Sequence, residues 1–157
     1  MFNYLAYTRV AKNNQYRKGN MDIVLIIGRV LFALIFINSG IAHLAKLQAM
    51  VGYAQFKKVP APKLSVIVTG LMLILGGLYV ALGVYADLGA LLLAIFLVLS
   101  AFKMHDFWTI QDAQAKQGET VNFFKNLSLA GAALIIFVMV GTGVEFGPSI
   151  TDGLFNL

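Results

Sequence analysis

The side chains of this chain that could do chemistry gather in one polar segment, residues 103–126. The segment holds one of the two histidines, the only tryptophan, three acidic residues and three lysines, and it lies between two long apolar runs. The other histidine, His43, ends an earlier apolar run, in which Ser39, His43 and Lys46 share one side of a helix. We expect the chemistry of the chain where these two regions meet.

Two histidines on separate helices are suited to redox chemistry. They can ligate a haem iron, or they can bracket a quinone headgroup, whose carbonyl oxygens need hydrogen-bond donors and, on reduction, protons. A neutral imidazole could donate a hydrogen bond to such a carbonyl and relay a proton from the membrane interface. The candidate residues for a quinone site are His43, His105, Trp108, Lys125, Asn126 and Ser39.

In this hypothesis the two histidines approach each other, directly or across a ligand, and Trp108 gives a flat wall for the quinone ring. The alternative interpretation is structural. Histidine, lysine and tryptophan at helix ends commonly anchor a protein at the membrane interface. Histidines that point apart would favour that alternative.

Membrane-spanning helices are the elements that position these residues. The chain is 59% hydrophobic and 12% charged, its mean hydropathy is +0.80, and its apolar residues occur in blocks. A helix needs about 20 residues to cross a hydrocarbon core of about 30 Å, and lipid admits only helices or closed barrels. Because the blocks lack strand-like alternation, the sequence predicts an all-α membrane protein, an antiparallel bundle of four transmembrane helices. The spans are predicted near Ile23–Lys46, Lys63–Val84, Tyr85–Met104 and Asn122–Gly141.

The connections between the spans carry their own signals. Pro60 bars helix continuation before the second span, which is rich in glycine and is therefore expected to pack tightly against its neighbours. In the third loop, Asp112 and Lys116 are four residues apart, a spacing that lets them pair on one face of a helix. Gly118 follows as a residue that commonly ends a helix. We therefore expect a short interfacial helix over Thr109–Gln117.

One charge lies inside the first span. Arg29 would be costly there unless it pairs or extends to the headgroups. Asp87 and Glu145 come at the same membrane face, so the sequence predicts an intramembrane ion pair of Arg29 with one of them. Contact with a quinone or an anionic lipid is the alternative.

Composition excludes several classes of function. The chain has no cysteine, which excludes a dithiol relay, a thiolate iron–sulfur site and disulfides, and no metal site is expected. The net charge of +5 comes with lysines that flank the spans, so we expect lipid or an acidic protein partner rather than nucleic acid. Lysines in the first and third loops favour a cytoplasmic location for those loops and both termini outside, although the basic N-terminal tail favours the reverse.

The predicted organisation is a basic tail over residues 1–21, a membrane domain over 22–143 and a short tail over 144–157. The first twenty residues lack the apolar core of a secretory signal, and the alternative is that they extend a chain that usually starts at Met21.

Ordered motifs on the four spans resemble those of the DoxX family. They are Gly28-Arg29, Ser39-Gly40-Ile41-Ala42-His43-Leu44, Val59-Pro60-Ala61-Pro62, Gly76-Gly77 with Leu82-Gly83, His105-Asp106-Phe107-Trp108 and Phe124-Lys125-Asn126-Leu127. The resemblance runs from about Met21 to Gly143 and implies a multi-pass protein of the bacterial inner membrane. Some members of the family are tied to quinone-linked oxidoreduction, including thiosulfate oxidation and oxidative-stress complexes. Many relatives carry a glutamate where this chain has Leu73, so a proton function of that carboxylate would be lost here or performed otherwise.

Two functions are compatible with the sequence. The first is a membrane subunit of a quinone-linked oxidoreductase, with a quinone as non-covalent cofactor and a partner subunit as the source of electrons. The second is a non-catalytic accessory subunit that stabilises a larger membrane complex or holds lipid. The absence from the sequence of cysteine, of an intramembrane carboxylate and of a metal-ligand cluster favours the second.

Overall fold

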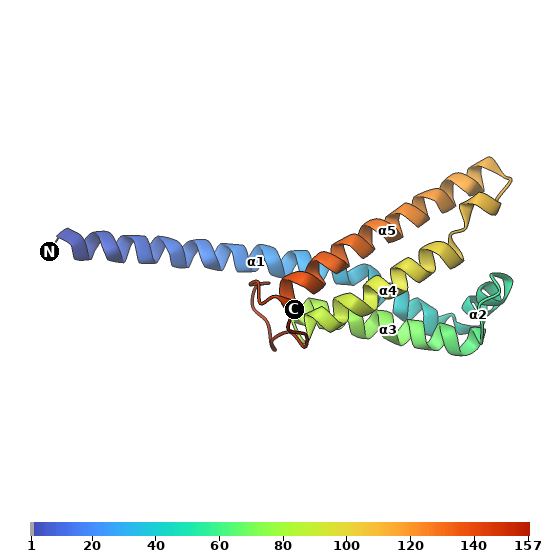
Figure 1. Ribbon diagram of the computed structural model, residues 1–157, viewed down its shortest axis with the longest axis horizontal. Coiled ribbons are helices and arrows are strands. Elements are labelled where there is room, and N and C mark those ends of the chain that lie inside the picture. The colour runs from blue at the N-terminus through green and yellow to red at the C-terminus, as the bar shows by residue number, and fades with distance from the viewer. Residues whose placement is uncertain (1) are drawn as a thin grey trace.

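A computed structural model describes the backbone of residues 2–157 and the side chains from Lys18 onward. Its four long helices are α1 (Phe2–Ala45), α3 (Pro62–Leu82), α4 (Ala86–Met104) and α5 (Ala113–Gly141), and the connections hold α2 (Leu47–Phe56) and a 3-10 turn, η1 (Phe107–Thr109) (Figure 1). Four segments are long and apolar enough to cross a membrane, namely Lys18–Ala45, Pro62–Leu82, Ala86–Thr109 and Ala113–Gly141. This confirms the predicted all-helical fold with four possible spans, and the described part of the chain contains no strand.

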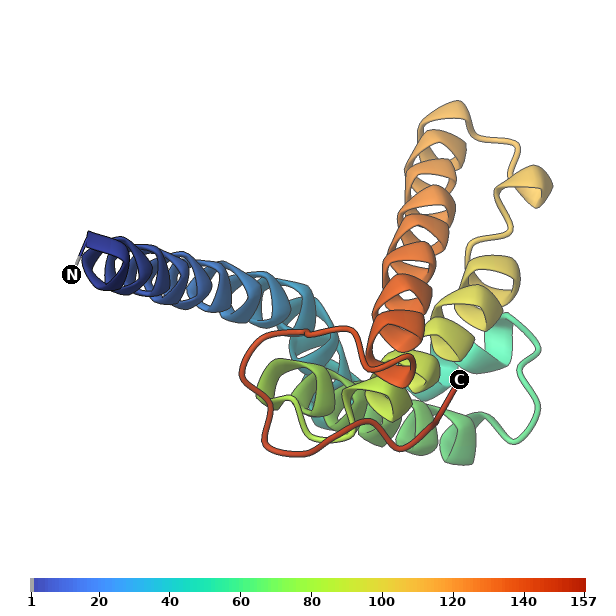
Figure 2. The ribbon, with the colours of Figure 1, turned by 60° about the vertical axis from the view of Figure 1, so that its left-hand side comes forward.

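The long helices pack in chain order, α1 on α3, α3 on α4 and α4 on α5. The chain turns back at each connection between them, so neighbours in sequence are neighbours in space (Figure 1). Figure 2 shows that α5 and the last turns of α4 diverge from α1 and α3 at the end that carries α2. The described helices are thus closely packed at one end, the closed end, and splayed at the other, the open end.

Glycines permit the close contact of α3 with its neighbours. A Cβ atom added at Gly40 of α1 would lie 2.6 Å from the backbone oxygen of Gly70, and one added at Gly89 of α4 would lie 2.9 Å from that of Gly76. Because lipid provides no hydrophobic drive between spans, such close approach of backbones supplies the packing energy. The expectation that the glycine-rich second span packs tightly is confirmed. Leu73, at the centre of α3, is fully buried in the resulting core.

The third loop differs from the prediction. Asp112 is the N-cap of α5, since its side chain accepts a hydrogen bond of 2.8 Å from the Ala115 backbone N–H, and the helix then continues without a break to Gly141. Gly118 does not end it, because a glycine inside a helix costs only about 1 kcal/mol relative to alanine. Of the residues predicted as a separate short helix, Thr109 therefore ends η1, residues 110–112 are irregular, and the rest form the first turns of α5.

The two predicted tails also have defined conformations. The α1 backbone is helical from Phe2, so the predicted boundary at residue 21 is not a helix end. Residues 142–157 form an irregular segment that crosses the closed end of the molecule (Figure 2). There the backbone N–H groups of Ile150 and Thr151 donate to the Gly83 carbonyl at 2.9 and 3.1 Å, in the turn between α3 and α4.

Candidate functional site

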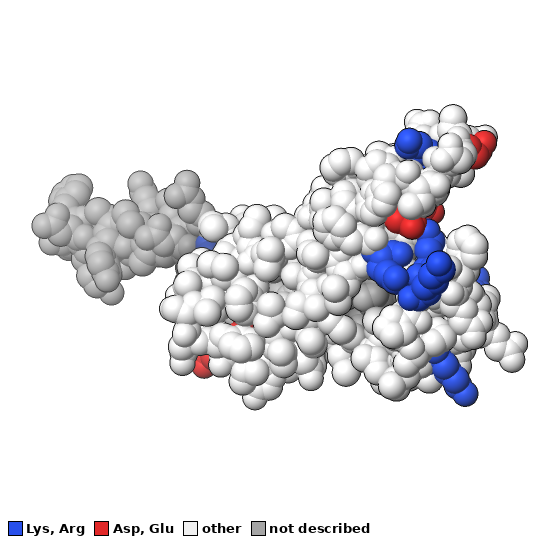
Figure 3. Space-filling view, turned by 45° about the vertical axis from the view of Figure 1, so that its right-hand side comes forward, with Lys and Arg blue, Asp and Glu red and all other residues white. Residues whose placement is uncertain are grey.

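A cavity of about 580 Å³ lies where the helices splay. All five α-helices contribute to its wall, which is mostly apolar but includes Ser39, His43, Lys103, His105 and Lys125. Figure 3 shows basic side chains gathered around a hollow at this end of the molecule, with acidic side chains next to them. The two histidines predicted to belong to one site therefore line one cavity.

His43 is held by its own helix. Its Nδ1 atom lies 2.8 Å from the carbonyl oxygen of Ser39, one turn earlier in α1. Its ring also meets the Phe96 ring of α4 edge to face, with centroids 6.3 Å apart. These contacts fix both the position and the plane of the imidazole at the cavity wall.

His105 is held by a carboxylate. Its Nδ1 atom lies 2.6 Å from Oε2 of Glu119, and both side chains are about three-quarters buried or more, at 20% and 25% exposed. His105 follows α4 and Glu119 lies in α5, so the pair joins these two helices across the connection between them. Glu119 is not among the site residues predicted from the sequence. The signal that could have found it was its place in the same polar segment, together with a helix beginning at Asp112 that would carry it back toward α4.

An ion pair and a hydrogen bond join the C-terminal end of α2 to the connection between α4 and α5. Lys57 forms an ion pair with Asp106, and the Tyr53 hydroxyl donates to the Met104 carbonyl at 3.2 Å. Burial raises the pKa of Tyr53 above its usual value, so the hydroxyl stays protonated and able to donate at neutral pH. Because Tyr53 also lines the cavity, α2 forms part of its wall and is anchored beside it.

The other predicted site residues divide into two groups. Asn126 and Lys125 line the cavity, where the Asn126 amide donates to the Ser100 hydroxyl at 3.3 Å and the Lys125 ammonium donates to Asn122 at 3.0 Å. Trp108 is not part of the cavity wall. It is half exposed, and its ring packs on aromatic rings, with centroids 5.2 Å from Phe107 and 5.8 Å from Phe123. The predicted stacking wall is corrected, because η1 turns Trp108 toward α5, and Phe96 is an aromatic ring in the cavity wall.

Arg29 does not form the predicted ion pair. It is buried at the closed end, where its guanidinium donates to the carbonyl oxygens of Phe146 and Pro148 at 3.2 and 2.8 Å and lies 3.4 Å from the Ser149 hydroxyl. Its charge also lies 5.5 Å from the centre of the Phe146 ring. The C-terminal segment folds back over α1, so backbone oxygens reach Arg29 in place of the two acids.

The two acids predicted to pair with Arg29 have other partners. Asp87 is fully buried and accepts hydrogen bonds from the backbone N–H groups of Leu88 at 2.8 Å and Phe155 at 2.7 Å. Glu145 lies 2.8 Å from the Lys18 ammonium, and both side chains are about two-thirds exposed. Asp87 and Arg29 therefore hold the same C-terminal segment through separate contacts.

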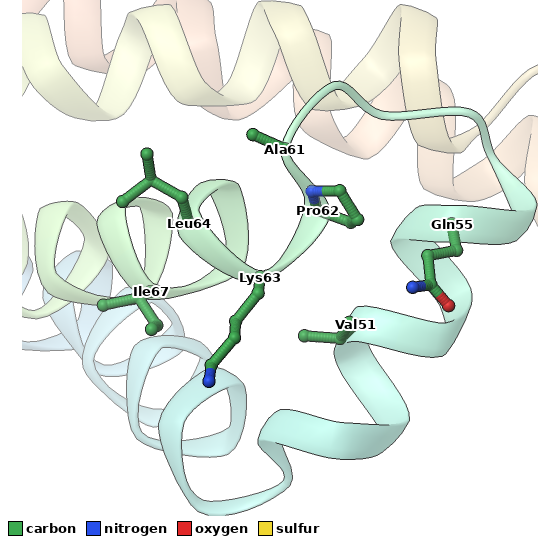
Figure 4. A pocket seen from close by; sticks show the side chains of 7 residues that line it. All are labelled: Val51, Gln55, Ala61, Pro62, Lys63, Leu64 and Ile67. Carbon is green, nitrogen blue, oxygen red and sulfur yellow. The ribbon is translucent and has the colours of Figure 1, made fainter.

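A second, more open pocket of about 570 Å³ lies between α2 and the start of α3 (Figure 4). Its wall is formed by Val51, Gln55, Ala61, Pro62, Lys63, Leu64 and Ile67. Figure 4 shows the Lys63 and Gln55 side chains well apart, so no set of polar groups converges there. Among the side chains described, no group of three or more histidine and acidic residues could hold a metal ion.

Comparison with known proteins gives two relationships and one negative result. The family model for DoxX matches residues 24–106. The chain is 28% identical over 116 residues to the inner membrane protein YphA of Escherichia coli (strain K12), an alignment that covers 74% of this chain and 82% of YphA. No solved structure matches it.

Proposed function

The chain belongs to the DoxX family, and from that premise we propose that this multi-pass inner membrane protein binds the headgroup of a membrane quinone in the cavity between its splayed helices. The observation that carries the proposal is the composition of that one cavity. Its wall is apolar over most of its extent, and it carries two histidines and two lysines. The proposed role is that of a membrane subunit in quinone-linked oxidoreduction.

The size and the chemistry of the cavity support this ligand class. A volume of about 580 Å³ lies within the roughly 300 to 1,000 Å³ of small-molecule sites. A quinone needs an apolar wall for its ring and tail, and polar groups for two oxygens that take up protons on reduction. The imidazoles of His43 and His105 can form hydrogen bonds with a ligand and carry protons, while Lys103 and Lys125 can donate to a ligand oxygen.

A membrane placement accompanies the proposal. The four spans cross the bilayer in antiparallel order, and the polar end, with α2, η1 and the first turns of α5, lies at one interface. The concentration of lysines in the first and third connections favours the cytoplasmic side for that end. The histidines would then exchange protons with the cytoplasm, and a partner subunit would supply or accept the electrons.

A second candidate function is that of a non-catalytic accessory subunit. The observation that favours it is Leu73, which is fully buried in the core at the position where the family resemblance implies a glutamate. An apolar side chain cannot transfer a proton. In this case the cavity would hold a structural lipid, and the helix bundle would stabilise a larger complex.

Ligand binding by purified protein in lipid nanodiscs separates the two functions. We expect a short-chain benzoquinone and its hydroquinone to bind, and His43→Ala and His105→Ala each to weaken binding of the hydroquinone by about tenfold, the loss of about 1.4 kcal/mol. The matched control is Lys63→Ala in the pocket of Figure 4, which should leave binding unchanged. Lipid extraction of the same preparation should find quinone, and an optical spectrum tests for haem. Unchanged binding in the double histidine variant, with phospholipid alone in the extract, would favour the accessory subunit.

A further inference from the structure

The hydrogen bond of His43 determines which of its ring nitrogens carries the hydrogen. Nδ1 lies 2.8 Å from the Ser39 carbonyl oxygen, and a carbonyl oxygen can only accept a hydrogen bond. Nδ1 must therefore be the protonated nitrogen. In a neutral imidazole the other nitrogen, Nε2, then has a lone pair and acts only as an acceptor.

The placement of the ring makes Nε2 the atom that a ligand meets. Nδ1 faces the backbone of α1, and Nε2 lies on the opposite side of the ring. Since the His43 side chain lines the cavity and Phe96 fixes the plane of its ring, Nε2 is the nitrogen available from inside the cavity. Neutral His43 thus offers an acceptor, where the sequence analysis expected a donor.

His105 has the same arrangement with a different partner. Its Nδ1 lies 2.6 Å from Glu119 Oε2, and an ionised carboxylate is also only an acceptor. Neutral His105 therefore holds its hydrogen toward Glu119 and leaves Nε2 as an acceptor. Both histidines in the cavity wall are set to accept hydrogen bonds from whatever the cavity contains.

We propose that the cavity selects the reduced, hydroxyl-bearing form of its ligand, a hydroquinone, over the oxidised quinone. This inference rests on the proposed function and specifies which redox form the site prefers. A hydroquinone hydroxyl can donate to Nε2 and at the same time accept from Lys103 or Lys125. A quinone carbonyl can use only the lysines, and it would leave the Nε2 lone pairs without a donor in a site from which water is displaced, which is unfavourable.

The preference has a size that can be measured. One hydrogen bond gained in one redox form and absent in the other should favour the hydroquinone by about tenfold, which corresponds to about 1.4 kcal/mol. Tighter binding of the reduced form raises the midpoint potential of the bound two-electron couple, by about 30 mV for a tenfold ratio. Glu119 acts here as a positioning residue, because it holds the hydrogen of His105 away from the ligand.

The test is calorimetric titration of the full chain in nanodiscs with decyl-benzoquinone and with its hydroquinone, without oxygen. The titration is run at a mildly alkaline pH, which favours the neutral form of imidazole in general, since its usual pKa is about 6.5. Wild-type protein should bind the hydroquinone about tenfold more tightly. His43→Phe keeps a ring of similar size without an acceptor, so it should reduce the ratio by weakening hydroquinone binding, while Lys63→Ala should keep the ratio.

Nitrogen-15 NMR of histidine-labelled protein gives a second readout that does not depend on a variant. With two histidines in the chain, the spectrum is simple, and we expect protonated Nδ1 and unprotonated Nε2 in both. Protonated Nε2 in His43, or quinone affinity equal to or above that of hydroquinone, overturns this inference and leaves the proposed function standing. Failure of both probes to bind overturns the proposed function together with it.

Discussion

Substitution of Arg29 by leucine should release the C-terminal segment from the closed end of the molecule. Arg29 is 4% exposed, and its guanidinium reaches the segment at three points, the carbonyls of Phe146 and Pro148 and the hydroxyl of Ser149. Leucine keeps the apolar contacts of the side chain but leaves these oxygens without their donor. The segment must then find other partners or detach.

The magnitude follows from the individual contacts. The two hydrogen bonds to carbonyls, at 2.8 and 3.2 Å, are charge-assisted and contribute about 1.5–3 kcal/mol each. The third contact, at 3.4 Å, is too long to add much. Against these stands the buried Nε atom of Arg29, which has no hydrogen-bond partner and costs about 1–3 kcal/mol. The net loss of unfolding free energy in Arg29→Leu should therefore be about 3 kcal/mol.

Thermal unfolding in detergent and limited proteolysis of the C-terminus measure the two consequences. We expect Arg29→Leu to lower the unfolding temperature and to expose residues 142–157 to cleavage, and Arg29→Lys to be intermediate because lysine keeps the charge but loses the planar fork. Glu145→Gln is the matched control, since its ion pair with Lys18 is largely exposed, and it should change neither measurement. An Arg29→Leu protein with wild-type stability and a protected C-terminus would refute the reasoning.

Three further predictions concern single contacts. Gly40→Ala places a methyl carbon 2.6 Å from a backbone oxygen of α3 and should cost about 1–3 kcal/mol in thermal unfolding, whereas Gly28→Ala, with no atom within 4 Å of the added carbon, should be tolerated. Asp87→Asn weakens a buried acceptor of two backbone N–H groups at 2.7 and 2.8 Å, so it should lose about 1–3 kcal/mol and increase cleavage of the C-terminal segment. Lys57→Met breaks the ion pair with Asp106, and it should increase amide hydrogen exchange within α2 while exchange in α3 stays at the wild-type rate.

The long helices could be predicted because burial in lipid imposes a composition that is visible in the sequence. The predicted third span, Tyr85–Met104, differs from α4 by one residue at its start. The predicted fourth span began at Asn122, yet α5 begins at Ala113. Hydropathy marks the part of a helix that suits hydrocarbon, whereas backbone hydrogen bonds continue into polar residues once Asp112 caps the first turn.

For the candidate site, the sequence predicts only which residues lie at the same end of the helix bundle. Helices that run in known directions bring His43 and His105 to one end, and this much follows from topology. Topology does not identify the hydrogen-bond partners of the two imidazoles. His43 binds the backbone carbonyl of Ser39, a group that every residue type has, and His105 binds Glu119, which is fourteen residues away in the chain. The partners of Arg29 were missed for the same reason, since any residue can supply a backbone carbonyl.

The two ends of the molecule divide its physical tasks. At the closed end, Arg29 and Asp87 each form hydrogen bonds to the C-terminal segment. This segment lies outside residues 24–106, which the family model matches. At the open end, the ion pair of Lys57 with Asp106 and the hydrogen bond of His105 with Glu119 hold the connection between α4 and α5 to α2 and to the first turns of α5. The close contact of α1 with α3 continues beside the cavity, since a Cβ atom added at Gly70 would lie 3.1 Å from Cβ of His43, and the cavity opens where α5 and the last turns of α4 diverge from this pair (Figure 2). Substitutions at the closed end should therefore change stability more than binding, and substitutions of the two histidines should change binding more than stability.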